Sequence, residues 1–533
     1  MVDAARLPVD INATADQMAQ EMFGDSMQIV SATYTGDVNS SGIYSNGDSV
    51  SPGATPSDTG VIFSTGATQF YTNTAGEDDE GNAFEANQRE NTSFNSQGVD
   101  NDAGMNEIAG TPTFDAALFD AEFIPDGDTL SMQFVFSSEE YLEFVDQGFN
   151  DVVGFWVNGE LVPLTIGDGD TSIDNINDQS NQNQFIDNRN DVVNTEMDGL
   201  TITLSVKAPV NAGEVNTLRI GIADGGDAFY DSNLLIAGDS IQSETIAADD
   251  RILMEQNDTQ TVDVLDNDSS VAGGMFITHI NNVPVVAGQS VQLPSGEIIT
   301  LNPDGTLTLQ TDNDIGTNAF TYQVADSDGN TDVGTVNLKT IPCFLAGTPL
   351  ATPQGPRLIE TLRPGDLVLT PNGPRPLHWV GKMTTRALGR HAPVIFDTGA
   401  LGNTAPLAVS PQHRMQVQSA HADLLFGTPT VLVPALHFVN NRTIHRDTSG
   451  RAITYIHVML DSHEMVQTHG IWSESFFPNP DLLSADQSAT AAELAEFFPN
   501  QAFNTPETLA KIGARPVRKY EAEVLLSALA LRH

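Results

Sequence analysis

The sequence is poor in cysteine and in basic residues. One Cys in 533 residues excludes an intrachain disulfide framework and any zinc site built from several cysteines. The 22 Lys and Arg are outnumbered by 71 Asp and Glu, which gives a net charge of −49. This balance argues against nucleic acid and anionic membranes as partners, because both are bound through basic side chains.

Long apolar runs are missing as well. No stretch of 18 apolar residues occurs, so we expect no transmembrane segment. The first residues (MVDAARLPVD) lack the apolar region of a cleavable signal peptide, so export, if it occurs, is expected to be independent of one. The most apolar stretch, residues 424–439, is broken by Gly and Pro and is interpreted as two buried strands.

The acidic charge is confined to the first two-thirds of the chain. Residues 343–533 hold 15 basic and 15 acidic residues, which leaves 7 basic and 56 acidic residues to positions 1–342. Histidine is distributed the other way, since only His279 of the 11 precedes position 343. Two chemically different parts therefore meet near Pro342, beside the single cysteine, Cys343.

Short alternating segments predict a mainly β fold in four parts. Residues 1–245 start with a helical pattern at 13–23, for which Thr14 is a candidate N-cap, and continue with strands typical of a β-sandwich or jelly-roll. Residues 246–342 carry the short strands and turns of an immunoglobulin- or cadherin-like sandwich. Residues 343–515 alternate apolar strands with turns and end in short helices, expected at 489–498 and from 505. Residues 516–533 form a tail.

Acidic loops in the first two parts suit a hard cation. The segment IADGGDAFYDSN places three Asp around two glycines, and carboxylates at such spacings are typical ligands of Ca²⁺. The alternative is that these residues only solubilise loops or form turns, because no EF-hand or nonapeptide repeat is present. Calcium is therefore the cofactor expected in residues 1–342, and the candidate ligands are Asp224, Asp227, Asp231, Asp266, Asp268, Asp326 and Asp328.

Two resemblances cover residues 1–342. The ordered motifs GVIFSTG, FSSEEYLEFV, GFNDVVGFWVNG and IADGGDAFYDSNLLIAG resemble the choice-of-anchor L domain, a bacterial surface or secreted β-domain. The pieces VLDND, LNPDGTLTL and FTYQVADSDGNTD resemble cadherin-like repeats of secreted bacterial adhesins. The resemblances imply a secreted or cell-surface protein with a cell-surface or matrix ligand.

A third resemblance begins at Cys343. A thiol is a strong nucleophile when a neighbour takes its proton, and ten His lie in the same part of the chain. CFLAGTPL with IETLRPGDLVLT, then LAVSPQHRMQV and TYIHVMLDSHEMVQTHG, resemble in order the blocks of Hint domains, the self-processing module of inteins and Hedgehog proteins. The closest pattern is that of the bacterial Hint subgroup.

The Hint resemblance implies a mechanism. Cys343 attacks the carbonyl of Pro342 and turns the amide into a thioester, an N-to-S acyl shift that needs no cofactor. His413 takes the acid/base position and Ser410 the position that bonds the scissile amide. The late block supplies three further candidates, which are expected to share one strand face: His457, Asp461 and His463.

The outcome expected from this site is cleavage rather than splicing. Splicing inteins end in His-Asn, and no His-Asn pair follows Cys343. Water, a thiol or an amine would then cleave the thioester and release or transfer residues 1–342. The alternative is a calcium-binding surface or adhesion protein with an inactive Hint domain; a protease acting on other proteins has little support, because no substrate cleft is indicated.

Overall fold

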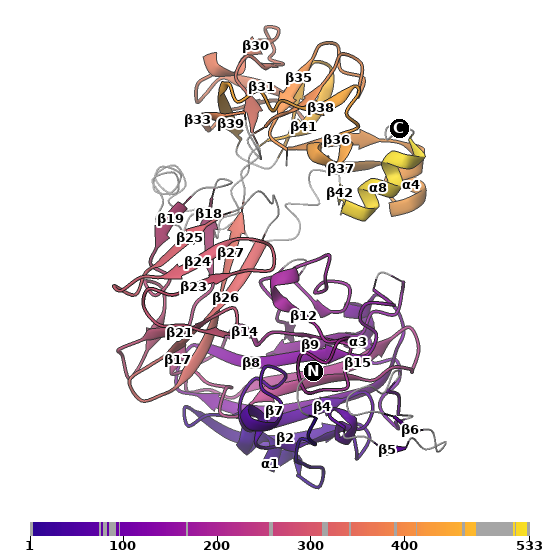
Figure 1. Ribbon diagram of the computed structural model, residues 1–533, viewed down its shortest axis with the longest axis vertical. Helices are drawn as coiled ribbons and strands as arrows, with labels where there is room; N and C mark the ends of the chain where they lie inside the picture. Colours follow the sequence, from indigo (N-terminus) through magenta and orange to yellow (C-terminus); the bar gives the residue numbers. More distant parts are fainter. Residues whose placement is uncertain are drawn as a thin grey trace. The chain divides into compact units, whose positions relative to one another are not determined.

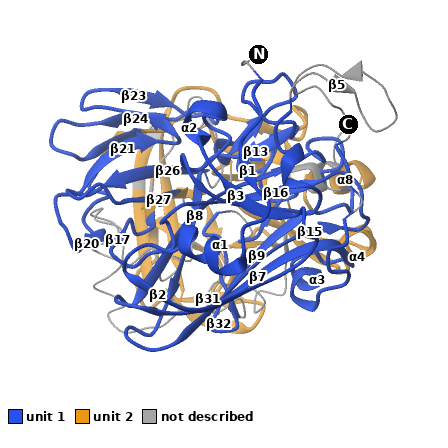
Figure 2. Ribbon diagram, turned by 90° about the horizontal axis from the view of Figure 1, so that it is seen from below, with its two compact units in different colours: residues 1–250, 261–309, 318–337 blue, residues 251–260, 310–317, 338–533 orange. Residues whose placement is uncertain are grey.

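The structure is a computed structural model that divides into two compact units. Unit 1 comprises Met1–Asp250, Thr261–Leu309 and Asn318–Asn337, and unit 2 comprises Arg251–Gln260, Gln310–Thr317 and Leu338–His533 (Figure 2). It describes every residue except 1–3, 74–75, 78–82, 85–91, 95, 146, 167–168, 255–258, 312–317, 340–342, 388–391, 412, 461–463, 476–514, 518 and 530–533. The helices expected at 489–498 and from 505 lie outside the described residues.

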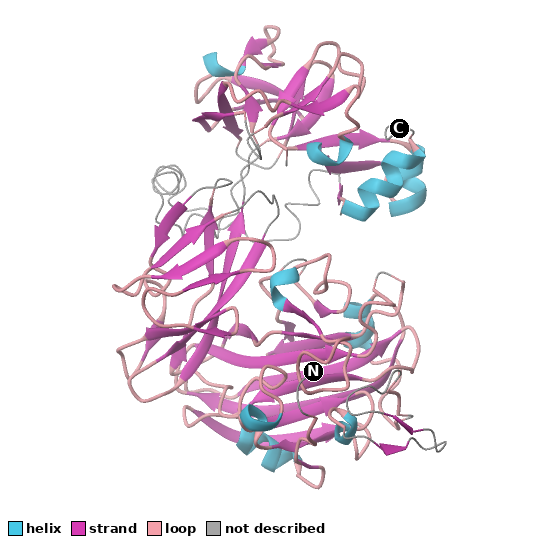
Figure 3. Ribbon diagram, viewed as in Figure 1, coloured by secondary structure: helices cyan, strands magenta, loops and turns pink. Residues whose placement is uncertain are grey.

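Strands dominate both units, and the predicted mainly β fold is confirmed (Figure 3). The larger part of unit 1 has two antiparallel sheets. The eight-stranded sheet has the order β1 (Val9–Asp10), β3 (Ser41–Tyr44), β4 (Gly60–Ser64), β16 (Ser232–Ala237), β8 (Thr129–Ser138), β13 (Gly199–Thr201) and β12 (Phe185–Asp187), and β14 (Leu204–Pro209) also pairs with β8. The six-stranded sheet has the order β10 (Glu160–Leu161), β9 (Val152–Val157), β15 (Asn216–Gly225), β7 (Thr113–Pro125) and β2 (Met27–Thr35), and β11 (Thr171–Ser172) pairs with β9.

Helices and one hairpin accompany these sheets. Thr14 is the N-cap of helix α1 (Ala15–Met22). Its hydroxyl accepts a hydrogen bond from the Gln17 backbone N–H, and the Gln17 side chain accepts one from the Thr14 backbone N–H. This reciprocal capping satisfies two N–H groups that a helix start leaves unpaired. The remaining elements are α2 (Gly47–Val50), α3 (Ala103–Ala109) and the hairpin β5 (Gly76–Glu77) and β6 (Ala83–Phe84).

The core lies between the two sheets and follows from strand alternation. On β8, Leu130, Met132, Phe134 and Phe136 all enter one large apolar cluster. Successive side chains of a strand point to opposite faces, so these four share a face. Burying such side chains contributes about 1.5–3 kcal/mol each, which makes this stripe a main source of the stability of the sandwich.

The other face of β8 contacts a second sandwich, most of whose residues belong to unit 1. Ser131 Oγ donates to Asp332 Oδ1 at 2.6 Å, and Gln133 Nε2 donates to the Thr331 carbonyl at 2.9 Å. The five-stranded sheet of this sandwich has the order β18 (Asp250–Leu253), β27 (Thr331–Lys339), β26 (Asn318–Ala325), β21 (Phe276–Ile280) and β22 (Val283–Pro284). The four-stranded sheet has the order β19 (Thr259–Val262), β25 (Leu307–Gln310), β24 (Ile298–Leu301) and β23 (Ser290–Gln292), and β17 (Thr245–Ile246) pairs separately with β20 (Ser269–Ser270).

Unit 2 is built on two further sheets (Figure 1). The six-stranded sheet has the order β33 (Trp379–Arg386), β39 (Ala452–Met459), β28 (Phe344–Leu345), β35 (Leu407–Val409), β34 (Val394–Phe396) and β38 (Ile444–Arg446). The five-stranded sheet has the order β40 (Met465–Thr468), β41 (Ile471–Glu474), β36 (Arg414–Gln418), β37 (Thr430–Pro434) and β42 (Arg515–Pro516). Two hairpins complete the strands: β29 (Pro349–Leu350) with β30 (Arg357–Leu358), and β31 (Leu367–Thr370) with β32 (Gly373–Pro376).

The prediction of two buried strands at 424–439 is wrong in its first half. The end of helix α4 (Ala420–Phe426) and a turn replace the first strand, and only β37 follows as a strand. Ser419 caps the helix by accepting from Ala422 N, and Gly427 ends it with a φ of 66°. Residues from helix α8 (Lys519–Ala528) join the same apolar cluster as α4 and β37, so the tail packs on the core of unit 2.

Candidate functional site

Cys343 lies directly before β28, the strand between β35 and β39. Phe344 on β28 pairs with Val409 on one side and with Ile456 on the other. Because both pairings are antiparallel, the residue before Phe344 lies opposite the residues that follow its two partners. The sheet register therefore brings Ser410 and His457 to Cys343 from two different strands.

Ser410 holds the backbone of Cys343 by two hydrogen bonds. The Cys343 N–H donates to Ser410 Oγ at 2.9 Å, and the Ser410 N–H donates to the Cys343 carbonyl at 2.9 Å. Both residues are buried, with exposed fractions of 9% for Ser410 and 4% for Cys343. The nitrogen bound by the Ser410 hydroxyl belongs to the peptide bond that the sequence predicts to be cut.

His457 brings an imidazole to the thiol of Cys343. Its Nε2 lies 3.7 Å from Cys343 Sγ, within hydrogen-bond range for sulfur. The ring stacks on Trp379, with centroids 6.1 Å apart. This indole lies over Gly381, where an added Cβ would be 2.0 Å from it, so only glycine leaves it room. An imidazole in this position can take the thiol proton and leave the nucleophilic thiolate.

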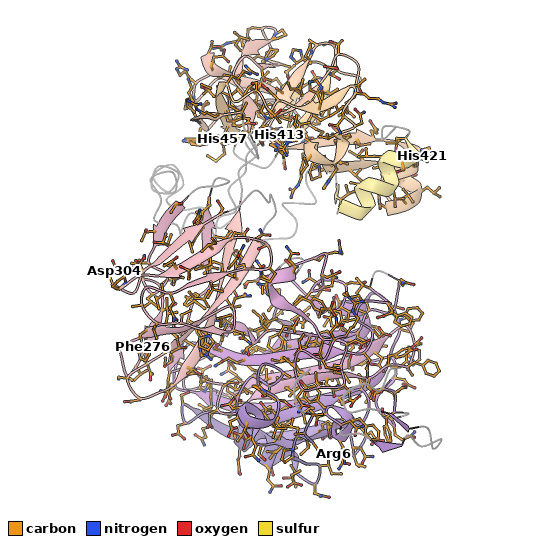
Figure 4. All side chains as sticks on the ribbon, in the orientation of Figure 1. Arg6, Phe276, Asp304, His413, His421 and His457 are labelled. Carbon is orange, nitrogen blue, oxygen red and sulfur yellow. The ribbon has the colours of Figure 1, made fainter. Side chains whose placement is uncertain are left out.

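His413 is buried behind the first turn of the same site. The backbone N–H of His413 donates to the Ser410 carbonyl at 3.0 Å, which closes the turn. The imidazole ring packs edge-on against Phe344, with ring centroids 4.3 Å apart. Among the described residues, neither ring nitrogen has a hydrogen-bond partner of good geometry, although the backbone of Cys343 is close enough to raise the pKa of the ring. Burial lowers the pKa of His413 to about 4, while the charge of Glu474 acts in the opposite direction. The ring is therefore neutral at pH 7. Figure 4 labels His413 and His457 in the same part of unit 2.

Glu474 is a residue of this site that the sequence reasoning missed. It is 4% exposed and lies at the end of β41, where its Oε1 accepts from the Arg414 N–H at 3.0 Å and its Oε2 lies 3.5 Å from Arg414 Nη1. Since its carboxylate acts on the charge state of His413, it belongs to the electrostatics of the site. The sequence shows a carboxylate four residues after the third Hint motif, but it does not indicate which residue this carboxylate faces.

Other predicted residues fall outside this cluster or outside the described residues. Pro342, Asp461 and His463 lie outside the described part of the chain. His469, another histidine of the same segment, has a φ of 46° in the turn between β40 and β41, and its carbonyl accepts from the Thr404 N–H and hydroxyl. Its place is thus explained by the turn.

The loop acids of the first sandwich form a buried group. Asp224 and Asp231 are 2% and 3% exposed, and the structure adds Glu140 and Asp151 to their neighbourhood. Burial is the main cause that raises the pKa values of Glu140, Asp151 and Asp224. For Glu140 and Asp224, the second cause is repulsion from the neighbouring carboxylates. A bulge between Ile222 and Asp224 shifts the register of β15 at this point. Asp227, by contrast, is half-buried and accepts from the Phe229 N–H, as a turn residue does.

The acids of the second sandwich separate into different places. Asp268 accepts a hydrogen bond from the Tyr322 hydroxyl at 2.9 Å. Burial is the main cause that raises the pKa of Asp250, and the charge of Asp268 is the second. Asp326 accepts five hydrogen bonds from its own turn and from Thr245 and Ser270, which outweigh burial and hold its pKa low. Asp266 and Asp328 are exposed. Within the described ranges, no group of three or more His, Cys, Asp or Glu is gathered closely enough to hold a metal ion.

A buried thiol clamped by a serine and next to a histidine, at the start of a strand in a β-rich unit, defines a self-processing type of site. Residues 342–480 match the family model of the Hint domain. Residues 8–242 match the choice-of-anchor L domain and residues 242–339 the bacterial Ig domain. The chain thus combines a choice-of-anchor L domain, a bacterial Ig domain and a self-processing Hint domain.

Solved inteins are similar to part of this chain. The gp41-1 intein is 15% identical, with 25% of this chain and 97% of that chain covered and a TM-score of 0.17. The MchDnaB-1 intein is 16% identical, with 25% and 98% covered and a TM-score of 0.17. The search of curated proteins found no match. None of the helices in the described part of the chain has the length and apolarity that a membrane crossing needs.

Proposed function

We propose that the Hint domain cuts its own chain between Pro342 and Cys343 and thereby releases or transfers the acidic residues 1–342. The observation that supports this proposal most directly is the pair of contacts at Cys343. Ser410 Oγ accepts from the nitrogen of the scissile bond at 2.9 Å, and His457 Nε2 lies 3.7 Å from the thiol. Nucleophile, proton acceptor and leaving nitrogen are therefore adjacent in a buried site.

The proposed reaction has two steps. His457 takes the proton of Cys343, and the thiolate adds to the Pro342 carbonyl. The carbon–nitrogen bond then breaks, a proton passes to the Cys343 nitrogen, and a thioester joins Pro342 to the sulfur. His413 is the proposed proton donor to that nitrogen. Because burial keeps its ring neutral at pH 7, it must first gain a proton, which Glu474 favours and which the protonated His457 supplies in this proposal. Water, a thiol or an amine attacks the thioester in the second step.

The test is a gel assay of the full chain. The wild type should yield pieces of 342 and 191 residues, in amounts that grow with added thiol or hydroxylamine, and Cys343→Ala should stay whole. A wild-type chain that remains intact in hydroxylamine would refute the proposal and would leave the alternative of a surface protein with an inactive Hint domain.

A second candidate function, calcium binding in the first sandwich, rests on two buried carboxylate oxygens alone, because the described acids form no group of three or more that is close enough to hold a metal ion. Asp224 Oδ1 and Glu140 Oε2 have no hydrogen-bond partner among the residues that the structure describes, and Asp151 and Asp231 are the neighbouring acids. Such oxygens are stable only when a cation or a proton neutralises them. A bound cation would also reduce the repulsion among the 56 acidic residues of positions 1–342.

Melting experiments separate the cation from the proton. If Ca²⁺ neutralises the group, a chelator should lower Tm, and Asp224→Asn should remove that dependence. If protons do so, Tm should rise as the pH falls from 8 to 5, because groups whose pKa is raised by folding stabilise the fold when protonated. A Tm that chelator leaves unchanged would reject calcium.

Secretion or display at the cell surface is part of the same proposal. The support is the match of residues 8–242 to the choice-of-anchor L domain. Detection of the 342-residue piece in the medium or on intact cells, by an antibody against it, is the direct test. A piece found only inside the producing cell would contradict this location.

A further inference from the structure

The outer face of the six-stranded sheet in unit 1 carries a groove of about 670 Å³ that the cleavage site does not use. Strands β2, β7, β15 and β9 form its floor, and Gly104 of α3 lies at one wall. Figure 1 shows α3 beside β9 and β15. The residues on which its chemistry depends are Ser31, Asp120, Glu122, Trp156, Thr217 and Arg219.

The sheet register arranges these side chains in two rows across the strands. In the first row Trp156 pairs with Arg219, Arg219 with Asp120, and Asp120 with Thr33. The second row runs from Thr217 to Glu122 and then to Ser31. Four strands at a spacing of about 4.8 Å separate the ends of the first row by roughly 14 Å. The groove is therefore long enough for a ligand made of several linked rings.

An aromatic surface closes one end of the groove. The indole of Trp156 covers Gly154, where an added Cβ would lie 2.3 Å from it, and it also approaches Gly104. Arg219 is held over the ring, with its guanidinium carbon 5.8 Å from the ring centroid and Nη2 2.9 Å from Asp102 Oδ2. The two glycines therefore give room to a partly exposed ring whose position is fixed from the other side by the guanidinium.

The polar groups of the groove match a ligand that both donates and accepts hydrogen bonds. Asp120 and Glu122 only accept, Arg219 only donates, and the hydroxyls of Ser31 and Thr217 do both. Asp120 keeps 49% of its side chain exposed, and Glu122 is exposed although it accepts from Ser31 Oγ at 3.0 Å. Arg219 is already paired with Asp102 at 2.9 Å and with Asp120 at 3.9 Å, and Glu122 adds a further negative charge, so an anionic ligand is disfavoured.

We infer that this groove binds a neutral oligosaccharide. A sugar ring presents an apolar C–H face, which stacks on an indole, and vicinal hydroxyls, which pair with carboxylate and guanidinium groups. The first row supplies the indole, the guanidinium and a carboxylate in that order, and the second row adds hydroxyls and a carboxylate. The groove is formed by unit 1 alone, so this inference does not depend on cleavage at Cys343.

Affinity gel electrophoresis of the full chain tests the inference. The probes are hydroxyethyl cellulose, laminarin, soluble starch and galactomannan, with alginate as the anionic comparison and polylysine as the cationic one. We expect at least one neutral polymer to retard the wild type and Trp156→Ala to weaken that retardation at least tenfold. Phe229→Ala removes another aromatic side chain of the same domain, 63% exposed and outside the groove, and should leave the retardation unchanged.

The outcomes that overturn the inference are distinct. Binding by none of the neutral polymers, retardation by alginate or polylysine alone, or equal losses in Trp156→Ala and Phe229→Ala would each contradict it. If Trp156→Ala lowers Tm, Glu122→Ala decides instead, because that exposed side chain can be removed without opening the core. A Glu122→Ala chain that binds like the wild type would then also refute the inference.

Discussion

The hydroxyl of Ser410 offers a direct test of how the cleavage site works. In the resting chain it accepts a hydrogen bond of 2.9 Å from the neutral Cys343 amide, inside a buried site. As the carbon–nitrogen bond breaks, that nitrogen gains positive charge and the hydrogen bond strengthens. A neutral hydrogen bond contributes about 0.5–1.5 kcal/mol and a charged one about 1.5–3 kcal/mol, so the gain is roughly 1–1.5 kcal/mol. At 1.36 kcal/mol for each factor of ten, Ser410→Ala should slow cleavage about 5- to 15-fold.

The assay is the rate of appearance of the 191-residue piece at pH 7 with saturating thiol. Ser410→Thr is the matched control, because it keeps the hydroxyl and should cleave at close to the wild-type rate. Both variants need the wild-type Tm, since Ser410 N also bonds the Cys343 carbonyl. Cleavage of Ser410→Ala at or above the wild-type rate would refute the reasoning, because the hydroxyl would then stabilise only the resting amide.

Three further predictions concern the two histidines and their support. His457→Asn should lower the rate of thioester formation about 100- to 10,000-fold, the usual contribution of a positioned base; equal rates in a single-turnover gel assay would place the base elsewhere. Burial lowers the pKa of His413 in the folded chain to about 4, against about 6.5 in the unfolded chain. As the pH falls below 6.5, the unfolded chain therefore takes up a proton that the folded chain does not, and the free energy of unfolding falls. Urea melts should show a loss of about 2 kcal/mol between pH 7 and pH 5 that His413→Asn abolishes, and an unchanged slope would contradict the buried neutral ring. Gly381→Ala forces a Cβ against the Trp379 indole and should cost about 1–3 kcal/mol and slow cleavage; an unchanged Tm and rate would show that the indole does not hold His457.

Local patterns in the sequence predicted the β architecture where one physical cause dominated. Leu130, Met132, Phe134 and Phe136 recur at every second position, as in a half-buried strand, and the structure buries all four in the same cluster. Residues 424–439 failed because apolar content was weighed above the cap at Ser419 and the stop at Gly427, which make a helix of the first half.

The site was predictable as a set of residues but not as a set of neighbours. Order in the sequence pointed to Cys343, Ser410, His413 and His457, while their roles stay predictions until cleavage is measured. The contact between Cys343 and His457 depends on the pairing of Phe344 with Ile456, which no local pattern specifies. Glu474 was missed for the same reason, since its place opposite Arg414 follows from the pairing of Met415 with Ser473.

The position of the proposed cut is compatible with two folded products. Strand β27 ends at Lys339 and β28 begins at Phe344, so the bond before Cys343 lies between strands. Among the described strands, those up to β27 pair only with one another, as do those from β28 onward. The large apolar clusters of the first sandwich and of unit 2 divide in the same way. Breaking this bond therefore separates no described strand pair.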